Sequence, residues 1–138
     1  MVIVKEDQQS EAGVLPDPEI FEKMSAYNHR LLDAGVMLTA EGLLPSSKGM
    51  RVKFEGDKRS VIDGPFAEAK ELVGGFWILQ RASRDEVLDW VKQAPFDGGT
   101  EIEIRQVGEL EDYGDAILDS VVKQERAMQN ELDARRAQ

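Results

Sequence analysis

The 138-residue sequence contains no cysteine, which excludes disulfide bonds, thiol nucleophiles and thiolate metal ligands. It contains one histidine, His29, so it cannot supply a cluster of histidine ligands to a metal. The Asp and Glu residues show no spacing typical of a carboxylate-only metal site either. We therefore expect no metal site and no cofactor.

Long apolar runs are also missing. The sequence has no stretch of about 20 apolar residues, which is the length that a transmembrane helix needs. Its apolar start, residues 2–4, is too short for the apolar core of a signal peptide. Together with the lack of cysteine, these absences predict a cytoplasmic protein that does not insert into membranes.

Basic residues are in the minority, with 17 Lys and Arg against 27 Asp and Glu and a formal net charge of −10. Apart from the short stretch 48–59, they are scattered along the chain. A surface of this kind repels phosphate backbones, so we expect no nucleic-acid partner. The same acidity favours solubility.

The apolar periodicity switches repeatedly between two and 3.6 residues, which predicts one domain of mixed α+β structure. One helix is expected to begin at Asp17 and Pro18 and to end at Gly35, and a second to begin at a capping box of Ser83 and Glu86. Strands are expected at residues 2–4, 36–44, 50–54, 59–62, 73–81 and 101–107, with residues 6–14 as a loop and residues 50–54 half-buried.

The predicted order is strand–helix–strand, a hairpin, and again strand–helix–strand. This is the ferredoxin-like split βαβ arrangement with an inserted hairpin. Both helices are expected on one face of the sheet, which leaves the other face to water or to a partner. In the last strand Ile102 and Ile104 point to one face, while Glu103 and Arg105 point to the other.

Residues 115–138 differ in character from the preceding domain, residues 1–114. They contain no glycine or proline and are rich in helix formers, which predicts a C-terminal helix. Its apolar seam spans barely two heptads and has Glu125 at its centre, which is too weak for a coiled coil. We expect this helix to pack loosely on the domain or on a partner subunit.

The most informative segment is residues 63–77. Asp63, Gly64 and Pro65 favour a turn that would hold the Asp63 carboxylate and the Phe66 ring in fixed directions. These two side chains are therefore candidates for a functional site. The alternative is structural: Asp63 would accept hydrogen bonds from backbone N–H groups, and Phe66 would fill the core.

This segment resembles the signature of the YCII-related family, specifically its DGPF subgroup. The resemblance implies a dimeric α/β barrel, in which the ferredoxin-like sheets of two subunits face each other. The family's activity is mostly undefined, and some members resemble accessory proteins encoded near sigma factors. The resemblance covers about residues 1–114. Besides the segment 63–77, the stretches that carry it are residues 2–5, 10–14, 34–38, 41–43, 45–49 and 101–105.

A distant branch of the family uses a histidine–aspartate pair, which suggests lyase-like or hydrolytic chemistry on small molecules. The branch histidine corresponds to Met24 in this sequence, whereas His29 lies closer to Gly35. The pair is therefore not carried over. We expect His29 at the surface, or at the flank of the apolar face of its helix.

The sheet face away from the helices carries charged side chains, which a second subunit would enclose. Enclosed charges must pair with one another or bind a ligand, and their pKa values shift. A Glu–Arg network between subunits is one interpretation, and a ligand site is the other. The aromatic candidates are more often part of a core. The candidate ligand-binding residues are Glu41, Asp63, Phe66, Trp77, Glu103 and Arg105.

Two functions are compatible with these features. The first is a binding or regulatory module, assembled as a homodimer, that recognises a small molecule or a protein partner. The second is a cofactor-independent enzyme acting on a small organic substrate, with Asp63 as the catalytic acid or base and Arg105 orienting an anionic group. We favour the first, because the branch histidine is missing and the sequence has no convincing nucleophile–base pair.

Overall fold

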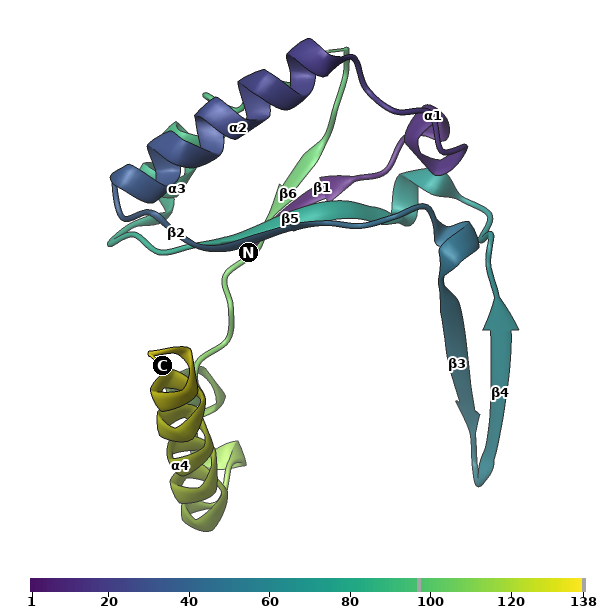
Figure 1. Cartoon of the computed structure of the whole chain (residues 1–138). Helices are drawn as coiled ribbons and strands as arrows, with labels where there is room; N and C mark the ends of the chain where they lie inside the picture. The colour runs from purple at the N-terminus through teal and green to yellow at the C-terminus, as the bar shows by residue number, and fades with distance from the viewer. Residues whose placement is uncertain (97, 138) are drawn as a thin grey trace. The chain divides into compact units, whose positions relative to one another are not determined.

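The computed structural model describes residues 1–96 and 98–137 and has mixed α+β structure with two antiparallel sheets (Figure 1). The chain forms two compact units, Met1–Arg105 and Gln106–Gln138. None of the helices among the described residues is long and apolar enough to cross a membrane. The elements are β1 (Val2–Lys5), α1 (Gln8–Glu11), α2 (Pro18–Asp33), β2 (Met37–Gly42), η1 (Ser46–Lys48), β3 (Met50–Glu55), β4 (Lys58–Asp63), η2 (Ala69–Glu71), β5 (Val73–Leu79), α3 (Arg84–Val91), β6 (Ile102–Ile104), η3 (Leu110–Ala116) and α4 (Asp119–Arg136).

The main sheet has four strands in the order β2-β5-β1-β6, and all neighbours are antiparallel. Strand β1 lies between β5 and β6, because Val2 is paired with both Trp77 and Ile104. Helix α2 connects β1 to β2, and α3 connects β5 to β6. Both helices pack on the same side of the sheet, as predicted, and contribute side chains to one core (Figure 1).

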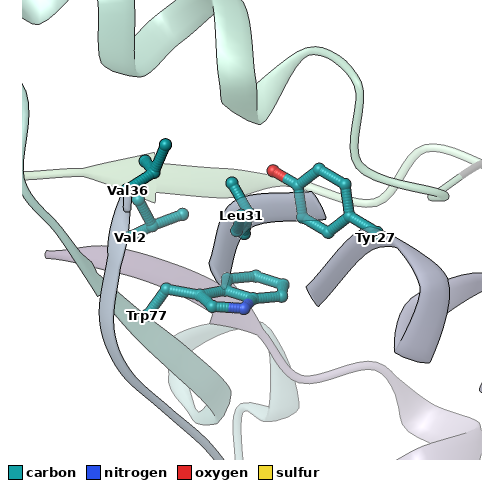
Figure 2. Close-up of a cluster of buried hydrophobic side chains, with 5 residues drawn as sticks. All are labelled: Val2, Tyr27, Leu31, Val36 and Trp77. Carbon is teal, nitrogen blue, oxygen red and sulfur yellow. The ribbon is translucent and has the colours of Figure 1, made fainter. Parts of the chain in front are cut away.

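The core is built around five buried side chains from the sheet and from α2 and its C-terminal end, namely Val2, Tyr27, Leu31, Val36 and Trp77 (Figure 2). The Tyr27 and Trp77 rings meet edge to face, with centroids 6.0 Å apart. The Trp77 Nε1–H donates to Asn28 Oδ1 at 2.8 Å, and the Tyr27 hydroxyl donates to the Trp90 carbonyl at 2.9 Å. Burial raises the pKa of Tyr27. Both aromatic residues therefore bury their rings without leaving a polar atom unpaired.

The predicted helix ends follow from local chemistry. Pro18 opens α2, where its missing N–H is not needed, although the Asp17 side chain makes no capping hydrogen bond. The helix ends at Gly35, which has a φ of +62° and donates its N–H to the Leu32 carbonyl. In α3 the Ser83 hydroxyl accepts the Glu86 N–H at 3.2 Å, which is one half of the predicted capping box.

Three local predictions were wrong. Residues 6–14 are not all loop, because the Asp7 carboxylate accepts two N–H bonds at the start of the short helix α1. Strand β6 is shorter than predicted, although Ile102 and Ile104 do pack against the core. The C-terminal helix starts at Asp119 rather than at residue 115, because residues 110–116 form the separate turn η3.

The predicted hairpin is present as β3 and β4, paired from Met50 opposite Asp63 to Glu55 opposite Lys58. The prediction that β3 is half-buried was wrong. Its apolar residues are exposed, and Phe54 reaches 68% exposure. The alternation of residues predicts two unlike faces, but β3 and β4 form a two-stranded sheet of their own and remain apart from the core.

The face of the main sheet away from α2 and α3 is partly apolar. Ile3 is paired with both Phe76 and Glu103, and Phe76 is paired with Glu41, so these four side chains share one face. Ile78 lies two residues beyond Phe76 on the same face. Ile3, Phe76 and Ile78 are each only partly buried in the single chain.

We expect Leu31→Ala to lower the free energy of unfolding by about 2–5 kcal/mol, because the Leu31 side chain is 0% exposed and its loss leaves a cavity. Chemical denaturation measures this change. The matched control is Leu32→Ala on the same helix, where the side chain is 56% exposed and the effect should stay within about 0.5 kcal/mol. Equal effects of the two substitutions would contradict the placement of the core.

Candidate functional site

The segment that follows β4 forms one wall of a cavity of about 230 Å³, which is partly open to solvent. The apolar part of its lining comes from Leu43, Leu44, Leu72 and Val73. The polar and aromatic part comes from Glu6, Glu11, Ser46, Arg51 and Phe66. These residues belong to segments at the ends of several strands, which meet beside α1, η1 and η2. The site is therefore assembled from distant parts of the sequence.

Ser46 connects three of these segments. Its backbone N–H donates to Glu11 Oε2 at 3.0 Å, and its hydroxyl donates to Glu11 Oε1. The same hydroxyl oxygen accepts the backbone N–H of Phe66 at 2.9 Å. Glu11 lies 35 residues before Ser46, and Phe66 lies 20 residues after it. A single serine therefore holds α1, η1 and the turn after β4 together.

Gly64 is required by the close packing of this turn against η1. A Cβ atom at position 64 would lie 1.8 Å from the Ser46 carbonyl oxygen, a distance that no side chain can accept. The Gly64 N–H also donates to the Gly49 carbonyl at 3.0 Å. From the sequence we expected this glycine in a turn. The structure shows why the turn needs a glycine at this position, namely the close approach of two backbones.

Glu6 is a nearly buried acidic side chain beside the cavity. It directly follows β1, its backbone N–H donates to the Leu72 carbonyl at 2.9 Å, and the residue is 9% exposed. Its carboxylate occupies the space that a side chain at position 74 would need, since a Cβ on Gly74 would lie 2.6 Å from Glu6 Oε2. The next residue, Gly75, allows the backbones of β2 and β5 to approach, because a Cβ there would lie 3.0 Å from the Glu41 carbonyl oxygen.

Arg51 contributes a positive charge to the cavity. It lies on β3, and its guanidinium carbon is 3.9 Å from the centre of the Phe66 ring. This distance is within the range of a cation–π interaction. The interaction fixes the Phe66 ring against the hairpin and leaves the guanidinium at the cavity wall.

The structure places the predicted site residues in different surroundings. Phe66 lines the cavity, whereas Trp77 is 7% exposed and belongs to the core on the helix side of the sheet. Asp63 is exposed at the end of β4, a strand that pairs with β3 and not with the main sheet. It was expected beside the open face of that sheet, and it does not line the cavity.

Some of the charged residues that were predicted on the open face of the sheet lie close to one another. Glu103 forms an ion pair with Lys5 at 3.0 Å, and Arg105 Nε lies 3.7 Å from its other oxygen. The hydrogen bond and the charge of Lys5 lower the pKa of Glu103. Glu41 is exposed on β2, opposite Phe76. This group is separate from the cavity, whose lining includes none of these charges.

His29 is exposed on α2, with Nδ1 2.8 Å from the Ser25 carbonyl oxygen, in agreement with the predicted surface position. Within residues 1–96 and 98–137, no group of three or more His, Asp or Glu side chains is arranged to hold a metal ion.

Of the lining residues that the structure describes, sequence reasoning predicted only Phe66, and it missed all four polar residues, namely Glu6, Glu11, Ser46 and Arg51. Glu11 and Ser46 fall within segments that carry the family resemblance, residues 10–14 and 45–49, so a signal for them was present. Arg51 was treated as an ordinary polar position of an alternating strand. Glu6 has no local signal beyond its place directly after the first strand.

We expect Ser46→Ala to lower the free energy of unfolding by about 1–2 kcal/mol, because the partly buried Phe66 N–H loses its acceptor. Amide hydrogen exchange at Phe66 should become faster. The neighbouring exposed serine provides the control, since Ser47→Ala should change stability by less than about 0.5 kcal/mol. Unchanged exchange at Phe66 in the Ser46 variant would argue against this role of the serine.

Comparison with known proteins identifies a family for most of the chain. The sequence profile of the YCII-related domain matches residues 1–111. A protein of Rhizobium meliloti (strain 1021), named "Uncharacterized protein R00369", is 32% identical over 76 residues. The aligned stretch is 55% of this chain and 61% of that protein, so it spans less than two thirds of the relative. Because the profile extends over the whole first unit, the chain belongs to the YCII-related family.

Proposed function

We propose that this protein is a small-molecule-binding or regulatory module that works as a homodimer, and that the cavity beside Phe66 is its binding site. The observation that carries the proposal is the arrangement around Ser46. Three segments that are far apart in the sequence are hydrogen-bonded so that they border a partly open cavity with both apolar and charged walls. Ligand sites commonly have such a mostly apolar lining with a few fixed polar groups.

The alternative is a cofactor-independent enzyme, lyase-like or hydrolase-like, with Asp63 as the acid or base and Arg105 orienting an anionic group. Binding is favoured over this alternative for two reasons. Asp63 and Arg105 do not line the cavity. The Ser46 hydroxyl does donate to the Glu11 carboxylate at the cavity, but its oxygen also accepts the Phe66 N–H, and this arrangement supports a structural role for the serine rather than that of a nucleophile.

The homodimer and the ferredoxin-like barrel are part of the same proposal. The strand order β2-β5-β1-β6, with two strand–helix–strand units, supports a ferredoxin-like arrangement. The partly apolar open face, with Ile3, Phe76 and Ile78, supports the pairing of two sheets. In such a dimer the ion pairs of Glu103 would become enclosed, and they are already matched within the chain.

A thermal-shift and turnover screen of small organic compounds, including aromatic and hydroxy-acid compounds, tests the binding function. We expect at least one compound to raise the melting temperature, since a ligand at a hundredfold excess over its Kd stabilises a protein by about 2.7 kcal/mol. Phe66→Ala should weaken that stabilisation. Phe54→Ala, which removes an exposed ring outside the cavity lining, should leave it unchanged. Equal loss in both variants would contradict the assignment of the site.

The same screen separates binding from catalysis. Turnover of a compound that disappears in Asp63→Asn or Arg105→Ala would favour the enzyme. Turnover that survives both substitutions would exclude the enzyme in this form.

Light scattering tests the dimer. At micromolar concentration we expect twice the mass of the chain for the wild type. Phe76→Glu places a charge on the open face and should give the monomer mass with an unchanged circular dichroism spectrum. The matched control is Phe21→Glu on α2, where the ring is exposed, and it should remain dimeric. A monomer mass for the wild type would reject the proposed assembly.

A further inference from the structure

We propose that the cavity selects small organic cations, aliphatic amines in their ammonium form, through the carboxylate of Glu6. This inference rests on the proposed function, because it names the ligand class of the same cavity. It depends on which charged groups around the cavity are already paired and which are not.

Glu6 is the acidic group without a partner. The residue is nine-tenths buried, and its carboxylate forms no hydrogen bond or ion pair with the backbone of residues 1–96 and 98–137 or with the side chains of residues 1–69, 71–96 and 98–137. In the same part of the chain, every fully buried side-chain oxygen or nitrogen has a hydrogen-bond partner. The Glu6 oxygens must therefore retain some exposure, and the residue lines the cavity. A nearly buried carboxylate without a partner is costly, and a cation in the cavity would offset that cost.

The other two charged groups of the cavity are already engaged. The Glu11 carboxylate accepts two hydrogen bonds from Ser46, so it serves to hold the segments together. The Arg51 guanidinium lies over the Phe66 ring. Among the lining side chains that the structure describes, two carboxylates and one guanidinium give a net negative charge. An anionic ligand could meet Arg51 but would face the unpaired charge of Glu6, whereas an ammonium group would meet Glu6 as an available acceptor.

The apolar part of the lining determines which kind of ligand fits beside the cationic group. Leu43, Leu44, Leu72 and Val73 form an apolar wall, which suits an aliphatic chain. The volume of about 230 Å³ is below the roughly 300–1,000 Å³ typical of sites for drug-sized molecules. The ligand is therefore short, with a single cationic end at Glu6 and a few carbon atoms along the leucines.

Gly74 supplies the space in which the Glu6 carboxylate lies. A Cβ at position 74 would be 2.6 Å from Glu6 Oε2 and 3.3 Å from Glu6 Cδ, and the nearest backbone atom in contact would be 3.7 Å away. An alanine there would displace the end of a flexible side chain without striking the backbone. Gly74→Ala therefore moves the carboxylate while keeping its charge, which makes it a second variant independent of Glu6→Gln.

The test is a methyl NMR titration of the full chain with three probes of the same carbon skeleton: butylammonium, 1-butanol and butanoate. We expect butylammonium to give saturable shifts of the Leu43, Leu44, Leu72 and Val73 methyl signals. Glu6→Gln keeps the shape of the side chain and removes its charge, so it should weaken butylammonium binding by about tenfold or more. Gly74→Ala should weaken binding as well. Glu22→Gln, the same change at an exposed position of α2, should leave it unchanged.

Three results would overturn the inference. Butylammonium that binds Glu6→Gln and Gly74→Ala as tightly as the wild type would show that the carboxylate is not the acceptor. Preferential binding of butanoate or 1-butanol to these methyl groups would reject the amine class but leave small-molecule binding in place. If no probe shifts these signals, the amine class is rejected, and the broader compound screen decides separately whether the cavity binds anything.

Discussion

The hydrogen bonds of Ser46 are the constraint on which the candidate site depends. Its hydroxyl group donates to Glu11 and accepts from the Phe66 N–H, so it orients two segments that have no pairing with each other in either sheet. Gly64 allows the turn to come close enough for this, because any side chain there would strike the Ser46 carbonyl. The shape of the cavity is therefore a consequence of one polar side chain and one missing side chain.

The two glutamates beside the cavity differ in their hydrogen bonds. One carboxylate is bonded within the chain, and the other remains available to a ligand. Glu11 lies in a short helix, and both of its carboxylate oxygens accept hydrogen bonds from Ser46. Its role is therefore structural, because it holds α1 against η1. Glu6 is more deeply buried than most acidic residues, yet its carboxylate has no partner among the described residues. Residue type alone would not distinguish them. The difference arises because Glu6 directly follows β1 and lies next to Gly74, which has no side chain.

Within the described part of the first unit, the open sheet face and the hairpin both expose apolar side chains, and the two exposures have different origins. The open face of the main sheet carries Ile3, Phe76 and Ile78 because α2 and α3 can cover only one side. The hairpin exposes Phe54 and its neighbours because β3 and β4 pair with each other alone. An alternating sequence specifies which side chains share a face, but it does not specify which element covers that face.

The sequence by itself determined the features that depend on neighbours along the chain. These include the start of α2 at Pro18, its end at Gly35, the hairpin, and the inward side of β6. Only the tertiary structure decided the site. In the folded chain Trp77 lies in the core, Asp63 is exposed, and Glu6 lines the cavity. The physical reason is that hydrogen-bond partners such as those of Ser46 lie tens of residues away in the sequence. Local propensities depend on neighbouring residues and therefore do not predict such contacts.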